Sequence, residues 1–336
     1  MDNTNTLTRR RFIGITAAVA SVAAVPFVAR AVGRTTAPEL EPVVWRGIAL
    51  GADAELRLYH PDKSFAAGLI QKAVAEVERL EKIFSLYRDD SRLVELNRTG
   101  RLNNPPADLL AVLSRSRSIH ELTAGAFDPT IQPLWQAYAE HFSRAPASES
   151  PPDSAALQKA LALVDFGRVR FDSKAVAFAE QGMALSFNGI AQGYITDRIT
   201  DMLREAGLER ALVDMGEIRG LDSRRSGIWQ AGIRNPDNEE AILLKVPLQN
   251  RALATSGGYG TTMDAAGKFT HLFNPRTGSS RPDYRSVSVM AQDAATADAL
   301  STAFSVSHMD TIRAVAAKLP DIRAWLVMAD GKIQTI

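Results

Sequence analysis

Two oxygen-bearing side chains near the C-terminus have the spacing of a metal site. Asp298 and Thr302 are four residues apart in the segment DAATADALSTAF, so a helix would place them on one face. Ser301 would add a backbone carbonyl beside them. Carboxylate, hydroxyl and carbonyl oxygens suit Mg²⁺, which proteins often hold together with a phosphate group. The same residues also fit an ordinary helix in which Asp298 interacts favourably with the helix dipole.

A second segment, MALSFNGIAQGYITDR, changes from strand-like to helix-like residues at Asn188 and Gly189. The expected strand is 183–187, the expected helix begins near Ile190, and Gly193 lies inside that helix. Glycine permits a tight turn or close helix packing, because it has no side chain. Alternatively, the backbone and the helix N-terminus bind an anionic ligand. The segment alone leaves both interpretations open.

Three further segments combine Gly, Asp, Thr or Pro at the ends of expected elements. They are AGAFDPTIQPLW with Asp128, VDMGEIRG with Asp214 and Glu217, and ATSGGYGTTMDAAGKFTHLFNPRTGSS with His271. The sequence has no Walker A loop, no G-x-G-x-x-G after a strand, no G-x-S-x-G and no H-E-x-x-H. The five histidines lie far apart in the sequence, so a zinc cluster is not expected.

Hydrophobic periodicity predicts helices and strands without strict alternation. Helices are expected at 67–85, at 107–123 with Gly125 as the C-terminal stop, at 190–206 and at 295–308. Strands are expected at 54–60, 169–180 as a hairpin, 183–187, 210–216, 228–233, 241–248, 251–257 and 286–291, with a last pair of elements at 311–319 and 324–330. Residues 143–156 are expected to form an exposed loop. The pattern predicts a single compact α+β domain over 40–336, with a mixed, largely antiparallel sheet and flanking helices.

The N-terminal residues have the layout of an export signal. Arginines at 9–11 precede an apolar stretch, and a small-x-small cleavage pattern follows at 29–31. Because the consecutive arginines resemble the twin-arginine (Tat) class, residues 1–31 are expected to be a Tat signal that the Tat translocase handles. The mature protein is then expected to be soluble in the periplasm. The apolar stretch is shorter than the roughly 20 residues that span a bilayer and contains Pro26, which disfavours a retained anchor.

The composition argues against several functional classes. The 336 residues carry a net charge of +1 and include no cysteine. Residues 1–31 hold four Arg and one Asp, which give +3 of that charge and leave −2 for the rest of the chain. Without cysteine there is no disulfide framework and no thiolate metal site. A weakly negative chain without a basic stripe argues against nucleic-acid binding.

Taken together, these segments resemble the ApbE family of FAD:protein FMN transferases. The resemblance extends from about Trp45 to the C-terminus, and IAQGY, HLFNPRTG and ADALSTA are its most specific parts. Members of this family use Mg²⁺ to split FAD at its pyrophosphate, pass FMN to a Thr or Ser hydroxyl of an acceptor flavoprotein as a phosphoester, and release AMP. The combination NGIAQGY…VDMGEIR is similar to the NosX branch, which accompanies nitrous-oxide respiration and serves the membrane flavoprotein NosR.

The resemblance implies roles for individual residues. The Mg²⁺ ligands would be Asp298, Thr302 and carbonyl oxygens at Gly189 and Ser301. The residues expected along FAD are Leu50, Ala126, Phe127, Asp128, Ser186, Gln192 and Leu272, with 126–128 at the adenine or ribose end. His271 and Asp298 are the catalytic candidates, and the group that accepts the proton of the acceptor hydroxyl stays open.

The chain departs from the usual family motifs at several positions. Ser186 and Gln192 stand where the motif DLGGIAKGY has Asp and Lys, Leu50 replaces a common Met, and MGE replaces GGD. Two other functions therefore remain as alternatives. One is a Mg²⁺-dependent FAD pyrophosphatase that releases FMN and AMP, and the other is a non-catalytic flavin-binding maturation protein.

Overall fold

A computed structural model describes residues 23–24, 40–223 and 229–336 of the chain. The predicted signal at 1–31 lies outside these residues apart from β1 (Ala23–Ala24), which pairs with strand β9 (Gln230–Asn235). Within the described residues, no helix combines the length and apolar character that a membrane span requires.

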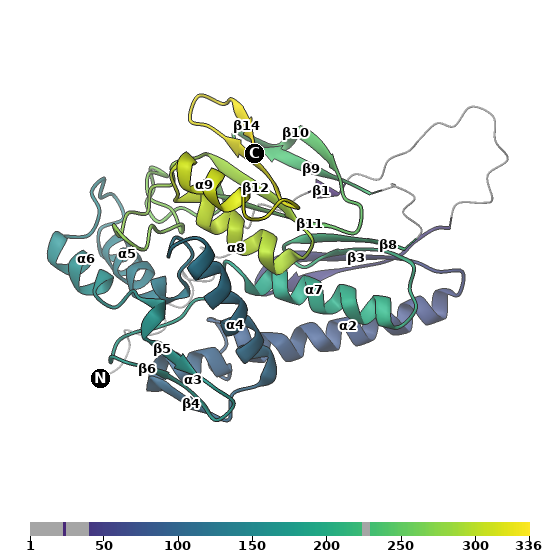
Figure 1. Cartoon of the computed structure of the whole chain (residues 1–336), viewed down its shortest axis with the longest axis horizontal. Coiled ribbons are helices and arrows are strands. Elements are labelled where there is room, and N and C mark those ends of the chain that lie inside the picture. Colours follow the sequence, from purple (N-terminus) through teal and green to yellow (C-terminus); the bar gives the residue numbers. More distant parts are fainter. Residues whose placement is uncertain (1–22, 25–39, 224–228) are drawn as a thin grey trace.

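The largest sheet has eight strands in the order β14-β13-β12-β11-β8-β7-β3-β2 (Figure 1). Its strands are β2 (Val43–Ala49), β3 (Ala52–Tyr59), β7 (Arg210–Asp214), β8 (Ile218–Asp222), β11 (Ala252–Gly257), β12 (Ser286–Ala291), β13 (Arg323–Val327) and β14 (Ile333–Thr335). All pairings described in this sheet are antiparallel. Short turns join β2 to β3 and β7 to β8, and such turns connect antiparallel neighbours. The α+β prediction is confirmed, with an antiparallel sheet instead of a mixed one.

Three helices pack on one face of this sheet: α2 (Lys63–Phe84), α7 (Ala191–Glu205) and α8 (Ala294–Ser305). The apolar residues of α2 recur at helical spacing, and Leu69, Ala73, Val77 and Leu80 are all buried in the main core. Figure 1 shows α7 and α2 running side by side. This packing confirms the predicted helices and brings the first turns of α7 and α8 close together.

The other face of the sheet is covered by β9 and β10 (Asn238–Pro247) of the three-stranded sheet β1-β9-β10. Strand residues alternate between the two cores: Val213 and Val289 face the helices, whereas Leu212 and Met290 pack in the smaller cluster with Trp229. Because successive side chains of a strand point to opposite faces, one sheet separates two hydrophobic cores.

Smaller elements surround this core. They are α3 (Arg92–Thr99), β4 (Arg101–Asn103), α4 (Ala107–Leu122), η1 (Pro129–Ile131), α5 (Gln132–Arg144), α6 (Ser154–Leu161), η2 (Phe166–Arg168), β5 (Val169–Phe171), β6 (Ala175–Phe178), η3 (Gly258–Gly260) and α9 (Met309–Ala316). The predicted hairpin is confirmed as β5 and β6. Gly125 follows α4 with φ of 86° and donates its N–H to the His120 carbonyl at 2.7 Å, as expected of a helix stop.

The strand predicted at 183–187 is wrong. The N–H and C=O of Leu185 both bond to the side-chain amide of Asn97, each at 2.8 Å, and the Ser186 N–H donates to the Pro129 carbonyl at 2.8 Å. The segment is buried but bonds to α3 and to η1 instead of to a strand. The helix expected at 295–308 ends at Ser305, and α9 begins soon afterwards.

Candidate active site

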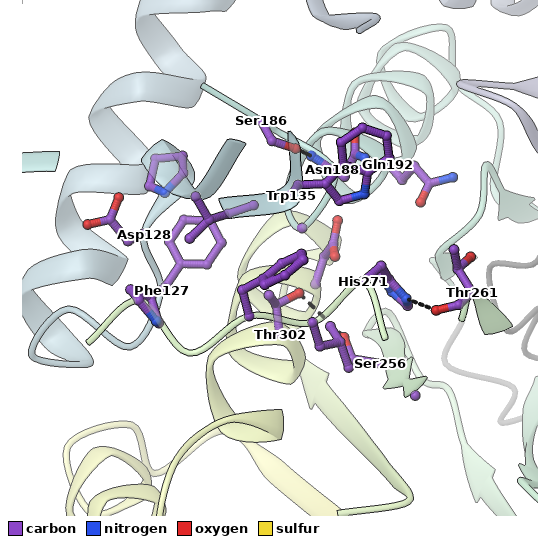
Figure 2. A pocket seen from close by; sticks show the side chains of 18 of the residues that line it. Phe127, Asp128, Trp135, Ser186, Asn188, Gln192, Ser256, Thr261, His271 and Thr302 are labelled. Carbon is purple, nitrogen blue, oxygen red and sulfur yellow. Dashed lines mark hydrogen bonds between the residues drawn. The ribbon is translucent and has the colours of Figure 1, made fainter. Parts of the chain in front are cut away.

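One cavity collects nearly all the residues that the sequence singled out (Figure 2). The predicted FAD, metal and catalytic residues that line it are Leu50, Ala126, Phe127, Asp128, Ser186, Gly189, Gln192, His271, Leu272, Asp298 and Thr302. Ser301 is the exception. Its backbone carbonyl accepts a hydrogen bond from the Ser305 hydroxyl at 2.8 Å, and its own hydroxyl bonds to Ser256 Oγ at 2.8 Å. A carbonyl oxygen has two lone pairs, so this bond does not decide whether the Ser301 carbonyl binds a metal, and that role stays a prediction.

Gly189 brings its backbone unusually close to Thr302. A Cβ atom placed on Gly189 would lie 2.7 Å from Thr302 Oγ1, which leaves no room for a side chain. The Thr302 hydroxyl also lies 3.4 Å from Ser256 Oγ (Figure 2). The absence of a side chain at 189 thus lets backbone and hydroxyl oxygens approach one point from two elements.

At Gly193 a side chain is excluded by helix packing instead. A Cβ atom there would lie 2.3 Å from the Ala294 carbonyl oxygen at the start of α8. The packing interpretation is therefore the one that fits Gly193, whereas Gly189 faces the cavity. This close contact between the two helices sets the position of Asp298 relative to the first turn of α7.

Asp298 is 3 % exposed, and its Oδ2 accepts a hydrogen bond from the Gly193 N–H at 3.2 Å. A carboxylate at the N-terminus of a helix is favoured by the helix dipole. Burial nevertheless raises the pKa of Asp298 to about 8, and the nearby Asp197 carboxylate adds to the rise. In this environment the ionised form of Asp298 needs a cation.

Glu217 is a site residue to which the sequence interpretation gave no role. It follows β7 in the segment VDMGEIRG, is 3 % exposed and lines the same cavity. Burial and repulsion from Asp298 and Asp214 raise its pKa well above the usual range. Its Oε2 has no hydrogen-bond partner among the described residues. An acidic residue directly after the turn glycine Gly216 was the signal that could have marked it.

The donor groups of this cavity fit a hard divalent cation. Besides Asp128, two buried carboxylates, Asp298 and Glu217, line it together with the Thr302 hydroxyl and the Gly189 backbone. Neither Lys nor Arg is among the described residues that line it. Oxygen ligands of this kind are those that Mg²⁺ prefers. No group of three or more His, Cys, Asp or Glu suited to a metal occurs in the described part of the chain, so backbone and hydroxyl oxygens would have to complete the site.

His271 lies on the opposite side of the cavity from Asp128 (Figure 2). Its Nδ1 is 3.1 Å from the Thr261 carbonyl oxygen. A carbonyl only accepts hydrogen bonds, so this contact places the proton on Nδ1 and leaves Nε2 with a free lone pair. Burial lowers the pKa of His271, which keeps the ring neutral at pH 7. A neutral ring with a free Nε2 can accept a proton.

Asp128 is held by hydrogen bonds from its own turn and from the start of η2. Its carboxylate accepts hydrogen bonds from the Thr130 N–H at 2.8 Å, from the Thr130 hydroxyl, and from the Phe166 N–H at 3.1 Å. Burial raises its pKa. These contacts fix the turn that presents Ala126 and Phe127 to the cavity, so the Asp128 side chain has a positioning role beside the predicted role towards adenine or ribose.

Solved flavin transferases have the same fold. The structure of the flavin transferase ApbE from Vibrio cholerae aligns with a TM-score of 0.76 at 23% identity, over 88% of this chain and 97% of that one. The apo flavinyl transferase ApbE of Pseudomonas stutzeri aligns with a TM-score of 0.74 at 24% identity, over 90% and 96% of the two chains.

The sequence comparison then gives the family. The model of the ApbE family matches residues 50–326, and the chain belongs to this family. A protein of Treponema pallidum named FAD:protein FMN transferase is 28% identical over 314 residues, which cover 85% of this chain and 84% of the relative. A protein of the same name from Haemophilus influenzae is 28% identical over 265 residues, covering 74% and 76%.

Proposed function

We propose that this protein is a Mg²⁺-dependent FAD:protein FMN transferase. Family membership and the names of the relatives support the reaction class. The observation that carries the proposal is the acidic cavity itself, which is lined by three buried carboxylates, Asp128, Glu217 and Asp298, without a lysine or arginine among its described lining residues. A pyrophosphate would be repelled there unless a cation stood between it and the carboxylates.

Asp298, Thr302 and the Gly189 backbone would hold the cation. Bound Mg²⁺ would supply charge neutralisation to the FAD pyrophosphate and to the AMP leaving group. The apolar residues Phe127, Ile131 and Trp135 line the cavity and suit the ring systems of FAD. The protein then contributes mainly by positioning, as in other phosphoryl transfers.

The transfer breaks one P–O bond and forms another. The hydroxyl oxygen of the acceptor Thr or Ser attacks the phosphorus on the FMN side, and the bond to the AMP oxygen breaks, so that AMP leaves. The hydroxyl proton needs an acceptor. His271 Nε2 is the group best suited, because Nδ1 is bonded to Thr261 and the ring is neutral.

Mass spectrometry of the acceptor tests the proposal directly. The purified protein is incubated with FAD, Mg²⁺ and an acceptor domain carrying a Thr/Ser flavinylation motif. We expect the acceptor to gain the mass of one FMN phosphoester, with AMP released, and EDTA to stop the reaction. Free FMN and AMP with an unmodified acceptor would identify a FAD pyrophosphatase instead. FAD binding without turnover would identify a flavin-binding maturation protein.

We further propose that the protein acts outside the cytoplasm on an exported or membrane flavoprotein of the NosR type. The arginines at 9–11 and the apolar stretch after them support export through the Tat translocase. Replacing Arg9 and Arg10 by Lys should leave the precursor in the cytoplasm, as fractionation and immunoblotting would show. Normal amounts of mature protein in the periplasm of that variant would contradict Tat export.

A further inference from the structure

Glu217 is buried in the cavity in a way that the reaction described above leaves unexplained. The residue lies in the turn between β7 and β8, with 3 % of its surface exposed. One interaction of its carboxylate is a hydrogen bond from the Thr255 backbone. Its Oε2 is left without a hydrogen-bond partner in the described part of the chain. An unpaired buried carboxylate oxygen costs free energy, so its presence requires a reason.

Among the described residues, the charged groups that act on Glu217 are acidic. Asp298 and Asp214 act on it as nearby acidic groups. The Gln192 side chain lies over the adjacent Gly216, where a Cβ atom would be 2.4 Å from Gln192 Nε2. No Lys or Arg is found among the described lining residues. What Glu217 lacks is therefore a cation within the cavity that it shares with Asp298.

We propose that Glu217 is a second carboxylate of the cation site, contacting the metal or one of its bound waters through Oε2. This inference rests on the proposed function, because it concerns the same cation. Mg²⁺ sites in nucleotide enzymes typically use one or two carboxylates together with substrate phosphates, and two carboxylates match its charge. Glu217 comes from the strand turn, whereas Asp298 and Thr302 come from α8, so the cation would join the sheet to the helix.

Mn²⁺ binding in the absence of FAD tests this inference without using turnover. Free Mn²⁺ is measured by electron paramagnetic resonance during titration of the wild type and of Glu217→Gln, which keeps the side-chain shape but removes the charge. We expect the Mn²⁺ Kd to rise by about 10- to 100-fold in this variant, the range found when groups supporting metal ligands are lost. Glu217→Asp should retain part of the affinity, because it keeps the charge.

Asp214→Asn is the matched control. Asp214 is another acidic residue in the same turn region, and its Oδ1 accepts the Gly216 N–H at 3.1 Å. It does not line the cavity, so its variant should bind Mn²⁺ with nearly wild-type affinity. Equal losses in the Glu217 and Asp214 variants would show a general effect of charge and overturn the direct role of Glu217.

The outcome separates this inference from the proposed function. If Glu217→Gln and Glu217→Asp bind Mn²⁺ as tightly as the wild type while Asp298→Asn does not, the inference is wrong and the metal site stands. If the wild type binds no Mn²⁺, and FMN transfer to the acceptor persists in EDTA, the metal dependence itself is wrong and the inference falls with it. Circular dichroism melting of each variant shows whether it is folded.

Discussion

Each of the helices α7 and α8 supplies one carboxylate that accepts hydrogen bonds from the N-terminus of the other helix. The two carboxylates differ in the number of hydrogen-bond and ion-pair partners that they have. Asp197 of α7 accepts the N–H groups of Ala294 and Ala295 at 2.8 and 2.9 Å and an Arg219 guanidinium hydrogen bond at 2.6 Å. Asp298 of α8 accepts the single Gly193 N–H at 3.2 Å. One carboxylate has the contacts of a structural ion pair, and the other is left short of positive charge.

The pKa values follow the same difference. Burial raises the pKa of Asp197 to about 6, with the Arg219 guanidinium opposing the rise, so Asp197 is ionised at pH 7. Burial raises the pKa of Asp298 to about 8, so in the absence of a cation this group keeps its proton at pH 7. The comparison teaches that burial alone does not mark a functional carboxylate, whereas burial with too few partners does.

The largest expected effect is on turnover by Asp298→Asn. The amide keeps the shape but removes the charged metal ligand, so we expect FMN transfer to slow about 1000-fold, or about 4 kcal/mol. Initial rates of acceptor flavinylation at saturating Mg²⁺ measure this. The variant should melt at or above the wild-type temperature, because it loses a poorly paired buried carboxyl. A variant with more than a tenth of wild-type activity would argue against the proposed site.

Asp197→Asn should act on stability instead. The change leaves the Arg219 guanidinium, which is largely buried, without its closest carboxylate and weakens the cap of α8. We expect the free energy of unfolding to fall by about 3 kcal/mol in urea at pH 7. Asp201→Asn is the control, since Asp201 lies farther from Arg219, at 3.7 Å, and is more exposed. Similar losses in both variants would contradict the structural role of Asp197.

The pH dependence of stability distinguishes the two carboxylates further. Because the pKa of Asp298 is raised, this group keeps its proton in the native state at pH values above about 4, at which the unfolded chain has released it. The free energy of unfolding of the metal-free protein should therefore fall as the pH rises towards 8. Asp197 contributes to this loss of stability only up to about pH 6. Burial raises the pKa of Asp214 to about 7, so Asp214 contributes up to about pH 7. Urea unfolding between pH 5 and 9 measures the slope.

Asp298→Asn should lower this slope throughout the range from pH 5 to 8. The share of the slope that it removes should be largest above pH 7, where Asp197 and Asp214 are mostly ionised in both states and only Glu217, whose pKa is also raised, still contributes beside Asp298. Added Mg²⁺ should reduce the slope in the wild type, because a bound cation favours the ionised carboxylate. An identical slope in wild type and variant would show that Asp298 does not carry the shift.

The smallest expected effect concerns the two departures from the family motif. Ser186 and Gln192 both line the cavity. Ser186→Asp adds a carboxylate near the FAD phosphates and should weaken FAD binding by about 1 kcal/mol. Gln192→Lys adds an unpaired positive charge and is not expected to improve binding alone, but the double variant should recover part of the loss because the new charges can pair. Calorimetric FAD titrations of the four proteins form the cycle, and strictly additive effects would mean that the positions do not share a site.

Much of the fold followed from local patterns. The apolar spacing in α2, the Gly125 stop of α4 and the β5–β6 hairpin are set by neighbouring residues, and the sequence predicted them. The segment 183–187 has the composition of a strand, but its backbone hydrogen bonds go to the side chain of Asn97, which is distant in sequence, and to Pro129 at the start of η1. The strand propensity of a segment carries no information about a hydrogen-bond partner that is distant in sequence, so the strand prediction for 183–187 was wrong.

By itself, the sequence determined the residue types of the site. It supplied the i, i+4 pair of Asp298 and Thr302, the glycines of NGIAQGY, and the segment order that marks the family. Only the tertiary structure decided what each residue does there. Gly193 packs against Ala294 whereas Gly189 faces Thr302. The Ser301 hydroxyl bonds to Ser256, which lines the cavity, and Glu217 lines the cavity itself. The reason is physical: hydrogen-bond satisfaction and burial depend on elements far apart in the chain, which spacing along one segment does not specify.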